Sequence, residues 1–440
     1  MPEQTYDLIG VGLGPFNLSL ACLAEPVEGL TSRFFDERPG FDWHPGLMLP
    51  DVHLQTPFMS DLVTLADPTS PYSFLNYSKQ QGRLYAFYIR ENFFLLRQEY
   101  NQYCQWAAQR LGNVAFGCRV TAVAFEDTAQ RYRLTVANRQ QGTTETCWAR
   151  KIVLGTGPTP YLPEGCEALG DGVIHAGDYL HHREALQQQQ RITVVGSGQS
   201  AAEIFYDLLE GAGEDSYRLS WITRSPRFFP LEYTKLTLEM TSPEYVDYFH
   251  ALPESTRDGL IADQTSLYKG INSELINAIY DLLYRKQLSG PVPVDLITNA
   301  SLMAAHRNRT DNALVLDFHH QEQGRDFVHR TDAMVLATGY RYQEPDCLAG
   351  LSGQLRRDAH GRLDPRRDYS IDHRGDIFIQ NGPVHRHGFV TPDLGMACYR
   401  NAHILRSITG REPYGVEEHI AFQCFGAPAD GLRNAQRESA

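Results

Sequence analysis

The fold is decided by residues 6–17, which read Tyr6-Asp7-Leu8-Ile9-Gly10-Val11-Gly12-Leu13-Gly14-Pro15-Phe16-Asn17. An apolar run typical of a buried strand ends in a glycine turn, and a helical pattern begins directly behind that turn. Gly12 permits a tight turn, and Gly14 lets the backbone approach a pyrophosphate at the helix N-terminus. Asn17 stands where this pattern usually has Gly or Ala. We predict a dinucleotide site formed by Gly12, Gly14, Pro15 and Asn17.

A second strand in the sequence strengthens this prediction. It reads Phe34-Phe35-Asp36 and ends in an acid. In dinucleotide-binding folds an acid at this place holds a ribose hydroxyl, so we add Asp36 to the predicted site. The alternative is that Asp36 is an ordinary solvated acid of a loop.

The chain contains a second turn of the same kind. Residues 191–195 form an apolar run, and Gly196-Ser197-Gly198-Gln199-Ser200-Ala201 follows it. The next strand, 217–222, leads into Thr223-Arg224-Ser225, where an enzyme using NAD would want an acid. An Arg beside a Ser suits a 2′-phosphate instead, unless Arg224 is only a surface residue. We predict an NADPH site whose residues are Gly196, Gly198, Gln199, Ser200, Arg224 and Ser225.

These two units predict an α/β fold with two Rossmann-like dinucleotide-binding domains. Helical spacing between them predicts a small helical substrate domain at 226–290. We expect an FAD-binding domain from 1–163 and 330–440 and an NADPH-binding domain from 164–225 and 291–329. The last ~20 residues are polar and contain Gly and Pro, so we expect a frayed tail.

Composition excludes several classes of protein. A net charge of −13 disfavours a nucleic-acid binder, and no apolar run is long enough for a membrane span. The N-terminus lacks the basic segment of a signal peptide. The eight cysteines form no CxxC pair, which disfavours zinc ribbons and disulfide-reductase flavoenzymes. We expect a cytoplasmic protein without a metal, in which a flavin reduced by NADPH passes electrons to oxygen.

Further motifs make the chain recognisable from Asp7 to about Leu405. They are Phe41-Asp42-Trp43-His44-Pro45-Gly46, Gln55-Thr56-Pro57-Phe58, Asp67-Pro68-Thr69-Ser70-Pro71-Tyr72, Phe74-Leu75-Asn76-Tyr77, Arg97-Gln98-Glu99-Tyr100, Ala337-Thr338-Gly339-Tyr340 and His387-Gly388. With the two glycine turns, they resemble the flavin-dependent N-hydroxylating monooxygenases of siderophore biosynthesis, the lysine and ornithine N-monooxygenase family.

The resemblance implies FAD on the first glycine turn and NADPH on the second. It also implies that Trp43, His44, Gln55, Val120 and His387 lie at the flavin, that the reaction passes through a flavin C4a-hydroperoxide, and that the enzyme is a tetramer. Without the resemblance, Trp43 would read as core packing and Gln55 as a loop-capping amide.

One departure from the family pattern bears on the substrate. Members acting on amino acids share a Phe-Leu-Lys-Asp-Leu run, whose Lys resembles a partner for the substrate carboxylate. Here the run is Phe58-Met59-Ser60-Asp61-Leu62. The ornithine enzymes also have an Asn before a Glu where our alignment places Leu238 and Glu239. Removing one half of a buried ion pair typically costs ~3–5 kcal/mol, and a substrate without a carboxylate escapes that cost.

We therefore predict N-hydroxylation of an aliphatic diamine, cadaverine or putrescine. The alternative is lysine or ornithine, with Lys235 or Lys269 taking over the carboxylate. Only a neutral amine can attack, and neutralising an alkylamine at pH 7 costs about 4.6 kcal/mol, so we expect apolar walls. The predicted substrate residues are Ser60, Leu238, Glu239, Phe389 and Leu394.

Glu239, with Asp61 behind it, is the predicted acceptor for the distal ammonium, and we assign no catalytic base. Two further alternatives stay open. One is another flavin monooxygenase chemistry on a bulkier compound. The other is a non-catalytic NADP-binding regulator, against which the presence of the first glycine turn argues.

Overall fold

The computed structural model describes residues 4–213 and 215–428. Its first sheet is built around β1 (Thr5–Val11), whose last four residues are buried. β1 runs parallel to β2 (Ser32–Phe35) and β8 (Thr143–Leu154) on its two sides. The strand order is β5-β2-β1-β8-β7-β6, and β19 also pairs with β8. The remaining bounds are β5 (Val114–Ala115), β6 (Cys118–Glu126), β7 (Arg131–Asn138) and β19 (Ile377–Ile379).

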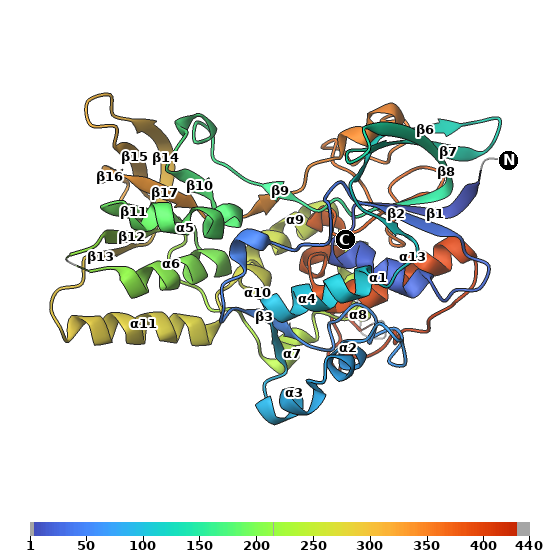
Figure 1. Cartoon of the computed structure of the whole chain (residues 1–440), viewed down its shortest axis with the longest axis horizontal. Helices are drawn as coiled ribbons and strands as arrows, with labels where there is room; N and C mark the ends of the chain where they lie inside the picture. The colour runs from blue at the N-terminus through green and yellow to red at the C-terminus, as the bar shows by residue number, and fades with distance from the viewer. Residues whose placement is uncertain (1–3, 214, 429–440) are drawn as a thin grey trace, which may run out of the picture.

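Helices cover the first sheet near the ends of its parallel strands. α1 (Pro15–Ala24) is buried along its whole length and contacts α4 (Arg97–Ala108) and α13 (Ala397–Thr409). Figure 1 shows these three helices in the same half of the molecule as β1 and β2. The antiparallel pair of β3 (His53–Pro57) and β4 (Phe94–Leu96) and the short helices α2 (Phe74–Gln80) and α3 (Leu84–Arg90), which lie between them in the sequence, complete this half.

The second sheet is parallel throughout, in the order β10-β17-β11-β12-β13. Alternate residues of its strands point to opposite faces. Ile192 and Val194 pack on the side of α6, and Val195 packs against a three-stranded antiparallel sheet. The bounds are β10 (Val173–His175), β11 (Arg191–Val195), β12 (Arg218–Ile222), β13 (Val294–Ile297), β14 (Ala300–Arg307), β15 (Leu314–His320), β16 (Arg325–Thr331), β17 (Ala333–Leu336), α5 (Tyr179–Gln187) and α6 (Gln199–Gly211).

Two chain crossings join the halves. β9 (Thr159–Pro160) and β18 (Tyr340–Arg341) pair in an antiparallel ribbon between the two sheets. They directly follow the glycine turns at 155–157 and 339. The predicted α/β fold with two Rossmann-like units is confirmed by this topology and by the structural comparisons given below.

The region predicted as a helical substrate domain divides between the two halves. α11 (Ser273–Gln287) packs on α6 of the second sheet through Ile279. The helices α8 (Pro243–Ala251), α9 (Glu254–Asp263) and α10 (Ser266–Lys269) instead pack with Phe389 and Val390 of the first half. β17 pairs with β10 and β11, although the predicted division at 329/330 assigns it to the FAD-binding domain. The other predicted boundaries stay predictions.

Within 4–213 and 215–428, no helix is long and apolar enough to cross a membrane. Nor do these described residues contain a group of three or more His, Cys, Asp or Glu side chains able to hold a metal ion.

Candidate active site

The main cavity lies at the carboxyl ends of β1, β2 and β8, the edge at which α/β sheets bind their ligands. Its volume is about 1420 Å³. The structure brings together many of the residues that the sequence assigned to the flavin and the substrate. Those lining the cavity are Gly12, Gly14, Pro15, Asp36, Trp43, His44, Val120 and Leu394.

The first glycine turn forms one wall of this cavity. Gly12 has φ +83, and a Cβ built on it would lie 2.6 Å from the Gly155 carbonyl oxygen of the neighbouring strand's turn. Gly14 is the N-cap of α1, and the nearest atom to a Cβ there is 3.9 Å away. The turn therefore needs glycine at the first position for its own geometry. The second position leaves open space in front of the helix N-terminus, as a pyrophosphate requires.

Asp36 and Arg38 form a fixed pair at the end of β2. The Asp36 carboxylate accepts the Leu13 backbone N–H at 2.7 Å and the Arg38 side-chain Nε–H at 3.0 Å. Arg38 also donates to the Asp42 carbonyl at 2.6 Å. Sequence reasoning missed Arg38, although its place two residues after the strand-terminal acid was a usable signal. The pair ties the glycine turn to the loop that carries the next cavity residues.

His44 is held as a neutral imidazole inside the cavity. Burial, helped by the charges of Arg97 and Arg38, lowers its pKa to about 4. Its backbone is left-handed, with φ 51. Its ring packs edge-on against Trp43 at 5.0 Å and Tyr340 at 5.6 Å. The aromatic pair predicted from the family pattern thus lines the cavity as an uncharged surface at neutral pH.

Three residues predicted for the flavin lie outside the lining of the cavity. Asn17 is fully buried and donates to the Gly12 and Val153 carbonyls at 2.7 and 3.3 Å, so it braces the turn from behind. His387 is buried, and its ring stacks on Tyr369 at 4.3 Å. Gln55 points toward the second half of the molecule. The structure gives each of these three side chains a protein partner.

The second glycine turn has the same construction. Gly196 has φ +152, and a Cβ on it would collide with the Ala337 carbonyl. Gly198 is the N-cap of α6, which begins with the half-buried Gln199 and Ser200. Val195 pairs with Ile222, so the turn leaves the sheet at the same edge as Arg224 and Ser225. The predicted NADPH residues therefore gather at this edge, with the Arg224 side chain exposed.

A buried polar network joins the two halves at Gln199. The Gln55 amide donates to Gln199 Oε1 at 3.3 Å, and the Gln199 amide donates to Glu203 Oε1 at 2.9 Å. Arg97 of α4 binds both oxygens of Glu203, at 3.0 and 2.9 Å. Glu203 is 1% exposed, so this ion pair is almost fully shielded from solvent. It fixes the second glycine turn relative to the main cavity.

Asp393 and Ser60 lie close together next to the cavity, and neither is among the residues that line it. Pro392 and Leu394 line the cavity and flank Asp393. A Cβ on Gly395 would lie 3.1 Å from Asp393 Oδ1 and 3.2 Å from Ser60 Oγ, so both side chains face the same side of Gly395. Burial raises the pKa of Asp393, although the Gly395 N–H and Arg400 partly oppose this. Sequence reasoning missed Asp393, whose signal was an acid five residues after Gly388.

The two acids predicted to receive an ammonium have other partners. Asp61 is 2% exposed and accepts backbone N–H groups from Val63, Thr64 and Phe74, at 2.7 to 2.9 Å. Glu239 accepts backbone N–H groups from the C-terminal segment at 3.0 and 3.1 Å. Their hydrogen bonds make both acids structural in this conformation.

The predicted apolar walls differ in how they are placed. Leu394 lines the cavity, and Leu238 is exposed on α7 (Lys235–Leu238). Phe389 is buried, and its ring packs between Tyr245 at 5.8 Å and Tyr268 at 6.2 Å. Phe389 therefore supports the helices behind the cavity, whereas Leu394 reaches its surface.

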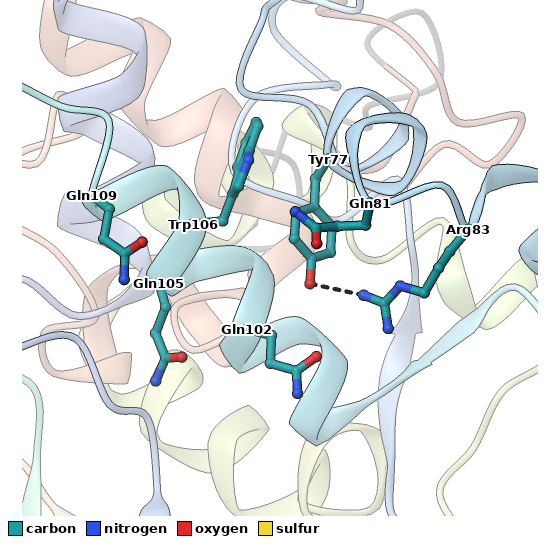
Figure 2. A pocket seen from close by; sticks show the side chains of 7 residues that line it. All are labelled: Tyr77, Gln81, Arg83, Gln102, Gln105, Trp106 and Gln109. Atoms are coloured by element: carbon teal, nitrogen blue, oxygen red, sulfur yellow. Dashed lines mark hydrogen bonds between the residues drawn. The ribbon is translucent and has the colours of Figure 1, made fainter.

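A second depression of about 470 Å³ lies on the outer side of α4. Figure 2 shows it lined by four glutamines, Trp106 and the hydrogen-bonded pair of Tyr77 and Arg83. No predicted site residue is among its seven lining residues. Gln105 borders both hollows and donates to the Phe41 carbonyl at 3.1 Å. The depression thus lies behind the main cavity and offers amides rather than acids or nucleophiles.

Comparison with known proteins gives a consistent result. The family model for L-lysine 6-monooxygenase/L-ornithine 5-monooxygenase matches residues 4–342. A putrescine N-hydroxylase from Shewanella oneidensis is 54% identical over 98% of this chain and 86% of its own length. An alcaligin biosynthesis enzyme from Bordetella pertussis is 48% identical over 98% of this chain and 94% of its own length.

A solved structure is similar over nearly the whole chain. It is the FAD-bound cadaverine monooxygenase of the desferrioxamine pathway from Erwinia amylovora, at 56% identity and a TM-score of 0.96. The match covers 97% of this chain and 100% of that one.

Proposed function

This chain belongs to the L-lysine 6-monooxygenase/L-ornithine 5-monooxygenase family, and from that premise we propose that it N-hydroxylates a diamine. The substrate is a primary aliphatic diamine, putrescine or cadaverine, and the product serves hydroxamate siderophore biosynthesis. The observation that carries this proposal is the pair of Ser60 and Asp393 next to the cavity, where Ser60 takes the place of the lysine that the sequence resemblance gives the amino acid enzymes. Relatives named for putrescine and cadaverine support it.

The residues present fit FAD and NADPH. The open space before Gly14 and the fixed Asp36 suit the pyrophosphate and ribose of FAD, and the Gly198 helix N-terminus with Arg224 suits NADPH. Bound FAD supplies the oxygen activation, and NADPH supplies the electrons. Trp43, His44 and Tyr340 form the walls that shield this chemistry from water.

Asp393 is the acceptor that we propose for the distal ammonium of the diamine. The carboxylate and Ser60 lie on the same side of Gly395, and the residues flanking Asp393, Pro392 and Leu394, line the cavity. A charge-assisted hydrogen bond to an ammonium relieves the cost of burying this carboxylate. The reacting amine has to be neutral, and Leu394 offers it an apolar surface that disfavours the charged form.

Lysine or ornithine would need a cation for its carboxylate. The two lysines considered for that role are placed elsewhere. Lys235 is exposed at the start of α7, and the Lys269 ammonium lies over the Tyr268 ring at 5.1 Å. An amino acid carboxylate beside Asp393 would instead meet a like charge, which disfavours binding.

Hydroxylamine formation with NADPH, FAD and a panel of amines tests the reaction. We expect product from putrescine or cadaverine and little from lysine or ornithine. A clear preference for lysine or ornithine would reject the diamine substrate. NADPH oxidation without hydroxylamine from any amine would reject N-hydroxylation itself.

Substitution of Asp393 tests the proposed ammonium site. Asp393→Asn preserves size and removes the charge, so we expect KM for the diamine to rise about tenfold or more. Flavin reduction by NADPH should change little. Ser60→Lys places a cation beside Asp393 and should also weaken diamine binding. An unchanged KM in both variants would exclude this site.

From the family resemblance we also propose a cytoplasmic tetramer. Light scattering on the purified protein tests the oligomeric state, with about four chain masses expected. Fractionation of the producing cells tests the location.

A further inference from the structure

The C-terminal segment 416–425 is held on the protein by two carboxylates. We call this segment the clamp. Glu244 Oε1 accepts the backbone N–H groups of Ile420 and Ala421 at 2.6 and 3.0 Å. Glu239 accepts those of Phe422 and Gln423 at 3.0 and 3.1 Å. The sequence predicts a frayed tail over about the last 20 residues. Carboxylates distant in sequence bind the backbone of its first residues, 421–423, and its part beyond 428 lies outside the described residues.

The helices that carry the two carboxylates differ in how many of their side chains are buried. Glu244 lies in the first turn of α8, which is anchored by the buried side chains of Tyr245, Val246 and Phe249. Glu239 is the C-cap of α7, and none of the four described residues of α7 is buried. A helix this short is not stable by itself in water. The position of α7 therefore depends on the contacts made at its ends.

The clamp supplies contacts at the C-terminal end of α7. Besides its backbone N–H, Gln423 donates its side-chain amide to Glu239 at 2.9 Å and to the Leu236 carbonyl. On the other side of the clamp, the Phe425 ring packs against Tyr245 at 5.1 Å. The clamp thus bridges the supported helix α8 and the unsupported helix α7.

The N-terminal end of α7 connects with the proposed amine site. Tyr233 stands just before Thr234, the N-cap of this helix, and its hydroxyl donates to the Gln55 carbonyl. Burial raises the pKa of Tyr233 to about 12, and the charge of Asp393 adds to the rise. Leu238, which aligns with a residue near the substrate in the ornithine enzymes, is carried by the same helix.

We propose that Glu239 is a positioning residue for amine hydroxylation, which acts by binding the clamp and thereby fixing α7 and Tyr233 beside the amine site. The inference rests on the proposed function for the identity of the reaction, but not for the clamp itself. Charge-assisted hydrogen bonds of this kind are stronger than neutral ones, and they favour the ionised carboxylate. In agreement, the N–H groups of Phe422 and Gln423 hold the pKa of Glu239 below its usual value.

Hydrogen exchange on the purified protein tests the clamp without any substrate. Glu239→Ala removes both acceptor oxygens, and we expect amides of 234–241 and 420–425 to exchange about tenfold faster. Glu239→Gln keeps one acceptor and should lie between this variant and the wild type. The matched control is Glu417→Ala, because Glu417 is exposed in the same segment and the described residues give it no hydrogen bond or ion pair. Unchanged exchange in Glu239→Ala would overturn the proposal.

The yield of hydroxylamine per NADPH oxidised tests the positioning role. In Glu239→Ala we expect this yield to fall about threefold or more and KM for the diamine to rise, with the rate of anaerobic flavin reduction unchanged. Glu239→Gln should restore part of the yield, and Glu417→Ala should match the wild type. Faster exchange with an unchanged yield would make Glu239 merely structural and overturn its role. Absence of hydroxylamine in the wild type would instead reject the proposed function, while the exchange result would still decide the clamp.

Discussion

The two glycine turns of this molecule share their backbone design and differ in the charges around them. Gly12 and Gly196 both press against the carbonyl of a neighbouring crossing strand, and Gly14 and Gly198 both cap a helix with open space in front. Behind the first turn the next strand ends in the fixed acid Asp36. After the second turn, the next strand leads into the exposed Arg224. The turn geometry thus provides a general place for a pyrophosphate, and the residue after the next strand decides which nucleotide fits.

The largest expected effect comes from replacing the first glycine of a turn, because both turns depend on its backbone conformation. Gly12→Ala places a Cβ 2.6 Å from the Gly155 oxygen at φ +83. We expect FAD affinity to fall about 100-fold or more, because strained backbone of this kind costs on the order of 1–3 kcal/mol before the displacement of Gly155 is included. Fluorescence titration with FAD measures it.

Gly196→Ala should do the same for NADPH while leaving FAD bound. Loss of both nucleotides in either variant would mean that the turns are not independent. Wild-type affinity in Gly12→Ala would contradict the described turn geometry.

A smaller effect is expected from substituting the residue that packs behind each glycine turn. Asn17 is buried with hydrogen bonds to two strand carbonyls, whereas the corresponding Ala201 has a small apolar side chain. Asn17→Ala leaves those carbonyls without this donor, and we expect a loss of about 2 kcal/mol in the free energy of unfolding. Chemical denaturation measures it. A variant of full stability but weakened FAD binding would instead mean that Asn17 contacts the cofactor, as the sequence predicted.

Substitution of Arg224 tests the difference in charge between the two nucleotide sites. In Arg224→Ala we expect KM for NADPH to rise about tenfold, with KM for NADH nearly unchanged, because only NADPH carries the 2′-phosphate. The control is Arg227→Ala, whose guanidinium stacks on Phe229 at 4.3 Å. Equal changes for both nucleotides would exclude the phosphate contact.

The smallest expected effect concerns the imidazole on the cavity side of the first turn. The pKa of His44 is lowered from 6.5 to about 4, so the unfolded chain takes up this proton first as the pH falls. The contribution of His44 is complete above pH 6.5 and is lost as the pH falls toward 4. Relative to His44→Gln, we expect the wild type to lose about 1 kcal/mol of stability by pH 5.5. Parallel pH profiles of the two proteins would contradict a neutral buried imidazole.

Local patterns predicted the parts of the fold that depend on local sequence. The strand before Gly12 and the strand before Gly196 both follow from apolar runs and glycine turns, and the structure has them as β1 and β11. The residues of the two turns were likewise assigned correctly to one edge of each sheet, since parallel strands present their carboxyl ends together.

Several site residues have partners far along the chain, which local sequence patterns cannot predict. His387 was expected at the flavin but stacks on Tyr369, and Glu239 was expected at the substrate but binds the clamp. Asp393 was overlooked because nothing local distinguishes it from a helix-capping acid, and it caps Gly395 as well. Only the packing around Gly395 reveals that Asp393 lies close to Ser60.

A competition assay tests the central claim most directly. The enzyme with FAD and NADPH is given equal concentrations of putrescine, cadaverine, lysine and ornithine, and the hydroxylamines are identified by mass. The account predicts that N-hydroxydiamine products dominate, because Ser60 stands where the amino acid enzymes have a lysine and because the Asp393 carboxylate offers an acceptor to an ammonium. A mixture dominated by N-hydroxylysine or N-hydroxyornithine would contradict it.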